Sequence, residues 1–332
     1  MEQRWTIRAG AVLILFAVLW KFSADGLPPS VQAFLQSPDT AAFLLYLETG
    51  RKLTLPQSTD PSEPETQYVV EATEPATTSP AGSITLGEGD AQYLTLHNTS
   101  GKNVDIAAML CQSLAWDLTD GAPAVLILHT HATESYTRTT EAYAETTQYR
   151  TLNEDYNMVR IGEYLTSLLE AQGIHVIHDR TLHDHPTYTG AYTNSRAAAK
   201  AYLEKYPSIR LVLDLHRDAV EYPNGLQMAT SATVQGKDSA QLMLVVGIGG
   251  QSQSHWQSNL SLAIKLHAIL EQNDPGVTRP LYLRSERFNQ DLLAGYLLIE
   301  VGAAGNTLTD ALTATGALAE AIAQLAFGAN TA

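Results

Sequence analysis

The stretch VLILHTHATESY, residues 125–136, begins as an apolar strand and ends in ionisable side chains. Four aliphatic residues come first, and His129, His131 and Glu134 follow them. Two imidazoles and a carboxylate at the end of a buried strand need a reason, because ionisable groups are costly to bury without partners. Ligands of open parallel sheets bind at the carboxyl ends of the strands. The stretch therefore predicts a buried strand whose end carries a functional site.

Strand and helix patterns alternate along the rest of the chain. The further predicted strands are apolar enough to be buried on both faces, as in a mainly parallel sheet, and are IHVIH (174–178), IRLVLDLH (209–216), QLMLVVG (241–247) and YLLIEVG (296–302). The helical patterns lie between or after them, at 156–172, 190–206, 258–273 and 308–328. This order predicts an α/β fold with a mainly parallel central sheet flanked by helices.

Ionisable residues stand at the ends of three predicted strands. His131 and Glu134 follow the first, His216 ends the third, and Glu300 lies near the end of the last. His-x-x-Glu with a distant second histidine makes a His2Glu ligand set, which leaves one position for water as in catalytic zinc sites. Glu300 is then the candidate general base. The pattern predicts a zinc-dependent hydrolytic site.

Two ligand assignments stay open on the sequence alone. Strand alternation puts His129 and His131 on the same face, so either can be the ligand. We favour His131, which lies farther past the apolar run and pairs with Glu134; His129 then orients it or contacts substrate. Glu154, in LNEDYN, is an alternative carboxylate ligand.

Other polar residues near these strand ends are candidates for supporting roles. Asp214 or Asp218 can accept the far N–H of a ligand histidine, and an ordinary salt bridge explains Asp218 equally well. Arg217 is a candidate for stabilising an oxyanion. Three amide side chains are candidates for contacting a polar substrate, namely Asn289, Gln290 and Asn306. Asn306 also suits the start of a helix.

Composition narrows the class of protein. The chain has 332 residues, of which 45% are hydrophobic, and a formal net charge of -15. That charge, with no basic stripe, argues against nucleic acid as a partner. The single cysteine, Cys111, cannot form an internal disulfide, and its apolar neighbours predict a buried, inert thiol.

The N-terminus has a membrane-directed pattern. The apolar run AGAVLILFAVLW, residues 9–20, is flanked by Arg8 and Lys21, which can extend a short span by snorkelling. We favour an uncleaved anchor over a signal peptide, because Phe22 stands where a cleavage site needs a small residue. Basic residues ahead of the run leave the N-terminus in the cytoplasm and place the rest of the chain outside.

Shifts in composition along the chain predict the boundaries of its segments and domains. Residues 1–24 are read as the cytoplasmic tip and membrane anchor. Residues 25–82 are read as a juxtamembrane segment and an acidic linker, rich in Pro, Ser, Thr and Glu, that cannot order itself. Residues 83–123, which open with two strand-like runs, extend a catalytic domain at 124–328.

Several of these motifs, in this order, resemble the stage II sporulation protein P family of cell-wall hydrolases from endospore-forming bacteria. The resemblance rests on ILHTHATESY (127–136), GIHVIHDRTLHDHPTYTGAY (173–192), VLDLHRDA (212–219) and FNQDLLAGYLLIEVGAAGNT (288–307). It covers roughly residues 84–328, and the anchor and tether ahead of them match the layout of the family.

The resemblance implies a zinc amidase fold of the phosphorylase/hydrolase-like type and an N-acetylmuramoyl-L-alanine amidase that cuts peptidoglycan. It also implies endopeptidase activity on peptide cross-links, a membrane-anchored enzyme whose catalytic domain faces the septal wall outside the cytoplasm, and stage II sporulation proteins D and M as partners in engulfment. By this resemblance the family histidines correspond to His129 or His131 and to His216, and the catalytic glutamate corresponds to Glu300.

Two other functions fit parts of the pattern. A metallocarboxypeptidase also uses His-x-x-Glu, a distant histidine and a glutamate base, but needs arginines for a substrate carboxylate. Arg138, Arg150 and Arg160 are the candidates for that set. A non-catalytic peptidoglycan-binding scaffold would lack a catalytic group, and the sequence lacks none.

Overall fold

The fold was analysed in a computed structural model, which describes residues 86–114, 118–137, 149–221, 227–249 and 255–328. The predicted anchor and most of the predicted linker, residues 1–85, lie outside these ranges. No helix within the described residues is both long and apolar enough to cross a membrane.

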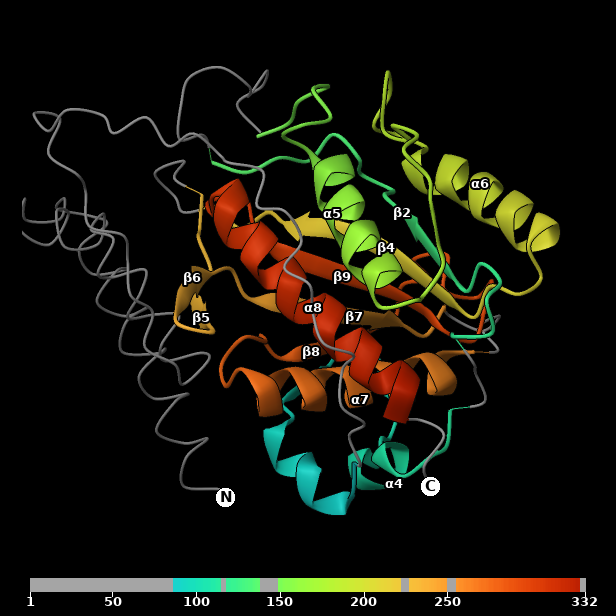
Figure 1. Ribbon diagram of the computed structural model, residues 1–332, viewed down its shortest axis with the longest axis vertical. Helices are drawn as coiled ribbons and strands as arrows, with labels where there is room; N and C mark the ends of the chain where they lie inside the picture. The colour runs from blue at the N-terminus through green and yellow to red at the C-terminus, as the bar shows by residue number, and fades with distance from the viewer. Residues whose placement is uncertain (1–85, 115–117, 138–148, 222–226, 250–254, 329–332) are drawn as a thin grey trace, which may run out of the picture. The chain divides into compact units, whose positions relative to one another are not determined.

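A seven-stranded sheet forms the centre of the described fold, with the strand order β1-β8-β7-β9-β4-β2-β3 (Figure 1). Its strands are β1 (Leu96–Asn98), β2 (Val125–Leu128), β3 (Val176–His178), β4 (Leu211–Asp218), β7 (Leu242–Gly247), β8 (Leu281–Arg284) and β9 (Tyr296–Ala303). Neighbouring strands are parallel except β7 and β9, which are antiparallel. The predicted mainly parallel α/β fold is confirmed, and the five predicted strands are all present.

The helices lie where the sequence places them. They are α5 (Met158–Ala171), α6 (Ala191–Lys205), α7 (Trp256–Asn273) and α8 (Leu308–Gly328). Asn157 begins α5, its side chain accepting a hydrogen bond from the backbone N–H of Val159. Thr307 begins α8, where its hydroxyl accepts from Asp310 N while the Asp310 carboxylate accepts from Thr307 N.

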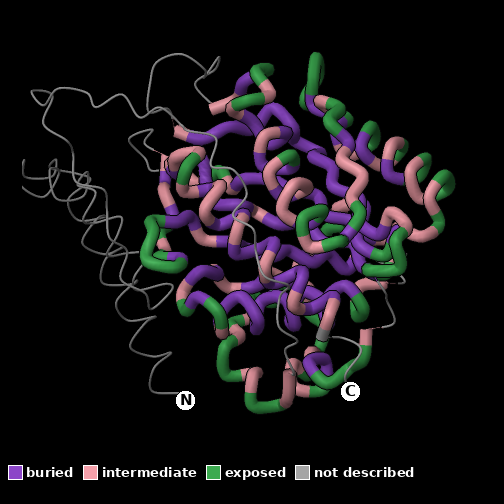
Figure 2. Tube along the Cα trace, in the orientation of Figure 1, coloured by how far each residue is buried: buried purple, intermediate pink, exposed green. Residues whose placement is uncertain are grey.

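The two faces of the sheet are covered differently. Alternate strand residues such as Ile127 and Leu213 pack with α5, α7 and α8 in the main core, while Leu128 and Val212 pack with α6. Figure 1 shows α5 and α8 crossing the front of the sheet, and Figure 2 shows the strands behind them as buried. Among the described residues, α6 and a small cluster of side chains cover the second face. That face therefore has room for polar groups.

The N-terminal extension differs from the expected pair of strands. Residues Glu88–Tyr93 form a 3-10 helix, η1, and only β1 is a strand. The short helix α4 (Ile106–Leu110) is attached to α7, because Ser261 and Lys265 donate hydrogen bonds to its C-terminal carbonyls. Cys111, expected to be buried, is exposed. A separate antiparallel hairpin, β5 (Ala232–Val234) with β6 (Lys237–Ser239), was not predicted.

Candidate active site

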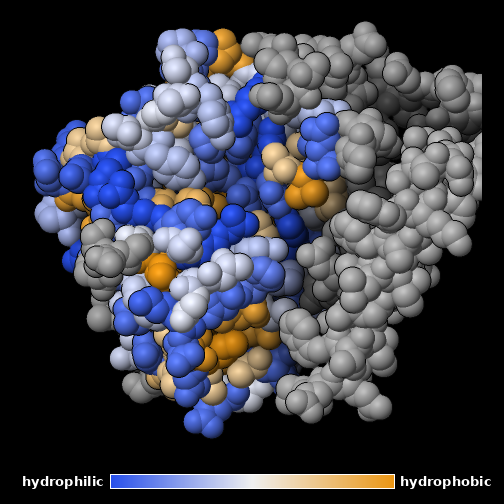
Figure 3. Space-filling model, turned by 180° about the vertical axis from the view of Figure 1, so that it is seen from behind, coloured by the Kyte–Doolittle hydropathy of each residue, from blue (hydrophilic) through white to orange (hydrophobic). Residues whose placement is uncertain are grey.

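The sheet register brings His216 and Glu300 together. The two residues are paired neighbours in the parallel ladder of β4 and β9. Successive strand residues alternate between faces, so His216 lies on the side of Val212, which packs with α6. Figure 3 views the molecule from the side opposite α5 and α8, and hydrophilic side chains gather towards the middle of that face. Two distant motifs therefore meet on the less covered face.

A register shift follows directly after this pair. His216 pairs with Glu300, but Asp218 pairs with Ala303, so β9 carries one extra residue. Gly302 lies in this bulge with φ +70°, and a Cβ there would come 2.8 Å from the Ala240 Cβ. Bulges beside active sites re-aim side chains. The bulge ends the regular pairing directly after His216 and Glu300.

His216 is held by a buried carboxylate. Its Nε2 lies 3.0 Å from Asp214 Oδ1, off the direction of a regular hydrogen bond, so we treat the contact as an ion pair. Asp214 is 0% exposed and accepts hydrogen bonds from Thr130 N and Oγ1, at 2.8 and 2.6 Å. Burial alone would lower the pKa of His216, but Asp214, Glu134 and Glu300 outweigh it and raise that pKa to about 9.

His131 approaches His216 from the loop after β2. The two imidazole centroids are 5.2 Å apart, with the rings nearly perpendicular. His131 Nε2 lies 3.2 Å from the Tyr188 hydroxyl, whereas Nδ1 is buried and has no hydrogen-bond partner among the residues that the structure describes. Burial lowers the pKa of His131. A neutral imidazole with an unpartnered ring nitrogen is the form that binds a metal ion.

Glu134 is the third predicted metal ligand and lies beside His131 and His216. Its Oε1 accepts from Arg150 Nη2 at 3.1 Å and its Oε2 accepts from the backbone N–H of Arg217 at 3.2 Å. The same Oε2 lies 3.7 Å from His216 Nδ1. Burial would raise the pKa of Glu134, but Arg217 and the two histidines outweigh it and lower that pKa. An ionised carboxylate thus lies beside both imidazoles.

The donor types of His131, Glu134 and His216 fit zinc, which prefers imidazole nitrogen and carboxylate oxygen. Among the described residues, His131 Nδ1 has no hydrogen-bond partner. In His216, Nδ1 faces Glu134 Oε2 and Nε2 faces Asp214 Oδ1. Within the described ranges, no three such side chains are already close enough together to count as a formed metal site. Zinc binding therefore stays a prediction that the donor types support.

Glu300 has the environment of a proton-transfer group. Its Oε2 is buried and has no hydrogen-bond partner in the described part of the chain. Burial raises the pKa of Glu300 to about 8, with Asp218 and Glu134 adding to the effect against the opposing charge of His216. A carboxyl group that titrates near neutral pH can both take and return a proton. Glu300 thus suits the predicted general base.

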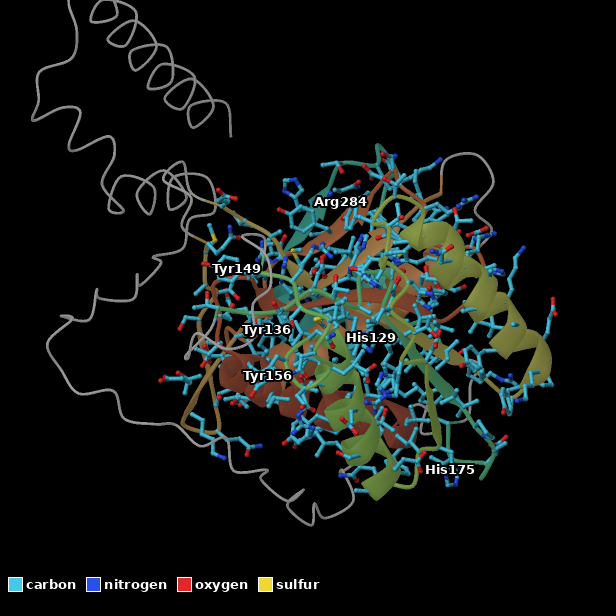
Figure 4. All side chains as sticks on the ribbon, turned by 90° about the horizontal axis from the view of Figure 1, so that it is seen from above. His129, Tyr136, Tyr149, Tyr156, His175 and Arg284 are labelled. Atoms are coloured by element: carbon cyan, nitrogen blue, oxygen red, sulfur yellow. The ribbon has the colours of Figure 1, made fainter. Side chains whose placement is uncertain are left out.

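His129 does not belong to this group. Its Nε2 lies 2.9 Å from His178 Nε2, and its Nδ1 lies 3.3 Å from the Leu215 carbonyl oxygen. The ring packs against Gly162 of α5, where a Cβ would come 2.5 Å from His129 Nε2. Figure 4 places His129 beside α5, in the interior. The expectation that His129 and His131 share a face is wrong, because β2 ends at Leu128 and the chain then turns.

Two alternative carboxylates have other partners. Glu154 is 41% exposed and forms a salt bridge with Arg180 at 2.7 Å. Asp218 forms one with Arg279 at 2.6 Å. Neither is in a hydrogen bond or ion pair with His131 or His216 in the described residues, so Glu134 and Asp214 fit the ligand and supporting roles better.

Arg217 is buried and bonded to the backbone. Its Nε donates to the Ser135 carbonyl at 2.8 Å and its Nη2 to the Tyr149 carbonyl at 2.9 Å. These bonds tie the loop after β2 to the end of β4. The guanidinium therefore positions Glu134 and its loop, and the geometry gives no support to the predicted contact with an oxyanion.

The three amide side chains predicted to contact substrate are buried in the fold. Asn289 donates to the Tyr192 carbonyl and to Ser195 Oγ of α6. Gln290 bonds to the backbone of β7, and Asn306 bonds to Thr230 and to Ala303 N. Their bonds hold loops in place and favour a structural role, and the contact with substrate stays a prediction.

Three residues of the site were missed by the sequence reasoning, and a fourth, Arg150, was considered only as a partner for a substrate carboxylate. Thr130 bonds Asp214, Arg150 bonds Glu134, and Tyr188 stacks on His131. The Tyr192 ring lies near both histidines, with centroid distances of 5.5 Å to His131 and 6.4 Å to His216. The two tyrosines stand in the motif HPTYTGAY, residues 185–192, which was noted only as a resemblance.

Comparisons with known proteins agree on one family. The family model described as stage II sporulation protein P matches residues 48–323. The chain is 27% identical over 223 residues to stage II sporulation protein P of Bacillus subtilis (strain 168), over 64% of this chain. The match spans 53% of that relative, about half of its length.

Solved structures with some likeness to the chain were also found. One is the N-acetylmuramoyl-L-alanine amidase AmiC2 of Nostoc punctiforme, with 13% identity, a TM-score of 0.36, and coverage of 62% of this chain and 96% of that one. Another is the N-acetylmuramyl-L-alanine amidase Ami1 of Mycobacterium smegmatis, with 12% identity and a TM-score of 0.38. The match covers 64% of this chain and 99% of the Ami1 chain.

Proposed function

We propose that this chain, which belongs to the stage II sporulation protein P family, is a zinc-dependent cell-wall hydrolase of sporulation. We assign it the amide bond between N-acetylmuramic acid and L-alanine of peptidoglycan, with peptide cross-links as a second substrate. The observation that carries the proposal is the pairing of His216 with Glu300 in the β4–β9 ladder, beside His131 and Glu134.

Three side chains would hold the metal. Among the described residues, His131 offers a buried Nδ1 that has no hydrogen-bond partner, and Glu134 offers an ionised carboxylate. His216, whose pKa is raised to about 9, would release its Nδ1 proton to bind the metal there, while Asp214 faces its other nitrogen. Zinc bound there would polarise the amide carbonyl and lower the pKa of a water molecule to ~7. The partners Asp214 and Tyr188 keep the two imidazoles from rotating.

Glu300 has the role of proton carrier. Its carboxylate takes a proton from the attacking water and then gives it to the departing alanine nitrogen. Burial raises the pKa of this carboxyl to about 8, which makes it easy to protonate, and a nearby cation would shift the balance towards the base. His216 is its ladder neighbour, so the acid–base group and a ligand are fixed by the same backbone pairing.

The setting of the enzyme is part of the proposal. An N-terminal anchor and a tether would hold an acidic hydrolase close to an immobile wall outside the membrane. We propose stage II sporulation proteins D and M as its partners at the septum, on the ground of family membership. The net charge of -15 argues against nucleic acid.

A carboxypeptidase is the less suitable enzyme. Arg150 is already paired with Glu134 and Asp184, and Arg160 lies 4.0 Å from Glu163. Arg138 lies outside the described residues. A guanidinium with two carboxylate partners is poorly suited to recognise the terminal carboxylate of a substrate.

The test is digestion of purified peptidoglycan by the full-length chain, with and without a zinc chelator, and identification of the products by mass spectrometry. We expect free stem peptides that begin at L-alanine, lost with chelator and regained with zinc. Products that keep the lactyl–alanine bond would contradict the bond assignment. The same stem peptides in the presence of chelator would contradict the zinc dependence.

A further inference from the structure

Tyr188 combines two properties that rarely occur together. Its side chain is among the most exposed of the large apolar or aromatic residues described, at 56%. Yet its ring stacks on the buried His131, with centroids 4.5 Å apart and planes 9° from parallel. An exposed aromatic ring gains little from burial, so its fixed position over a site residue suggests a role at that site.

The hydroxyl of Tyr188 bears on which nitrogen of His131 carries a proton. Tyr188 Oη lies 3.2 Å from His131 Nε2. A neutral imidazole carries one N–H; when Nε2–H donates to the phenol oxygen, Nδ1 keeps its lone pair. Nδ1 is buried without a hydrogen-bond partner among the described residues, and a buried polar atom of this kind points to a bound ligand such as an ion. The phenol therefore faces the nitrogen that the metal would not use.

Arg150 links Tyr188 to the second predicted ligand. Its guanidinium carbon lies 4.7 Å from the centroid of the Tyr188 ring. The same guanidinium donates to Glu134 Oε1 at 3.1 Å and to Asp184 Oδ2 at 2.7 Å. His131 and Glu134 are thus joined through two side chains that neither bind metal nor belong to the sheet.

We infer that Tyr188 is a positioning residue for metal binding: its hydroxyl accepts from His131 Nε2–H, selects the tautomer with a free Nδ1, and holds the ring in place. The inference rests on the proposed function only for the zinc ion. It assigns Tyr188 no contact with the scissile bond.

Tyr188→Phe is the variant that separates the hydroxyl from the ring. It keeps the stacking surface and removes the hydrogen-bond partner. Loss of an outer partner of a ligand histidine typically weakens metal binding about 10–100-fold. The matched control is Tyr93→Phe, which makes the same chemical change at a partly exposed tyrosine of η1. Zinc affinities of the full-length proteins would be measured by competition with a chromophoric chelator.

Each outcome decides a separate point. The inference is supported if the wild type binds zinc, Tyr188→Phe loses about 10–100-fold in zinc affinity, and Tyr93→Phe loses none. Equal affinities of wild type and Tyr188→Phe would overturn it and leave the proposed function standing. No zinc binding by the wild type would overturn the zinc-dependent function, and this inference with it.

A second measurement excludes a general effect on the fold. In metal-free protein labelled with ¹⁵N-histidine, the His131 signals are assigned by their absence in His131→Gln. We expect the proton on Nε2 in the wild type and a mixture of tautomers in Tyr188→Phe, at an unchanged melting temperature. Identical tautomers in both proteins, or a lower melting temperature that accounts for the affinity loss, would overturn the inference.

Discussion

His216 and His131, the two histidines of the proposed metal site, are held by different parts of the molecule. His216 lies within β4, and its partner Asp214 is fully buried and bonded twice by Thr130. His131 lies in the turn after β2, and its partner Tyr188 is exposed to solvent. One ligand is thus fixed by the sheet and the other by loop side chains.

This difference has an energetic meaning. The Asp214–His216 contact lies in a low-dielectric interior, where a charge that loses its partner is costly. The Tyr188–His131 contact competes with water, which can replace the phenol oxygen in part. We call His216, Asp214 and Glu300 the strand half of the site, and His131 and Tyr188 the loop half. We therefore expect the strand half to be preformed and intolerant of substitution, and the loop half to be adjustable.

The largest effect is expected at Glu300. Glu300→Gln keeps the shape of the side chain but removes the proton acceptor, so turnover of peptidoglycan should fall about 10²–10⁴-fold while zinc stays bound. His216→Ala should lose both turnover and zinc, because it removes a ligand. The metal content of the purified variants, measured by mass spectrometry, tests both predictions. The reverse pattern, with zinc lost only from Glu300→Gln, would contradict both roles.

The comparison itself is tested by Asp214→Asn against Tyr188→Phe. Breaking a buried ion pair costs about 3–5 kcal/mol, and the isosteric Asn should fall at the lower end of that range. The exposed hydroxyl should contribute less than about 0.5 kcal/mol to the stability of the metal-free protein. Urea unfolding at pH 7 with chelator measures the loss of unfolding free energy in both variants. Equal losses would show that the two halves of the site are held alike.

The sequence predicts the strand half of the site better than the loop half, for a physical reason. Carboxyl ends of parallel strands share one edge, so His216 and Glu300 could be placed together from their strand patterns alone. Alternation cannot tell where a strand stops, which is why the expectation that His129 and His131 share a face was wrong. Tyr188 lies 57 residues from His131 in the chain and follows no periodic pattern.

Buried amides are a second feature whose role the sequence alone does not determine. Asn289 and Gln290 lie beside the site in the sequence, and a polar side chain near a predicted active site suggests a substrate contact. The structure instead uses their hydrogen bonds to hold α6 and β7. Sequence spacing alone does not distinguish an amide that bonds the backbone from one that bonds a ligand.

The strand half should also show a distinct pH dependence. The pKa of Glu300 is raised from the ordinary value of 4.5 to about 8 by burial, so the folded protein holds a proton that the unfolded chain has lost. Its contribution to stability is therefore complete below pH 4.5 and is lost as the pH rises towards 8, at up to about 1.4 kcal/mol per pH unit.

Glu300→Gln isolates that contribution, because a neutral glutamine does not titrate and resembles the protonated acid. Unfolding free energies measured with chelator should show the wild type becoming progressively less stable than Glu300→Gln as the pH rises from 5.5 to 7.5. A difference that stays constant would show that Glu300 is ionised throughout, as a solvated carboxylate would be. His216, whose pKa is raised to about 9, contributes equally to both proteins while Glu300 is neutral.

The smallest effect is expected at Glu154, the carboxylate that the sequence offered as an alternative ligand. Its partner Arg180 is as exposed as Glu154 itself, with 48% and 41% of the side chains accessible, and such pairs contribute about 0–1 kcal/mol. Glu154→Gln should leave zinc affinity and turnover unchanged, whereas Glu134→Gln, the same substitution at the buried carboxylate, should lower both. Chelator competition compares the two variants directly. A loss of zinc affinity in Glu154→Gln as large as in Glu134→Gln would move the carboxylate ligand from the loop beside Arg150 to the exposed surface.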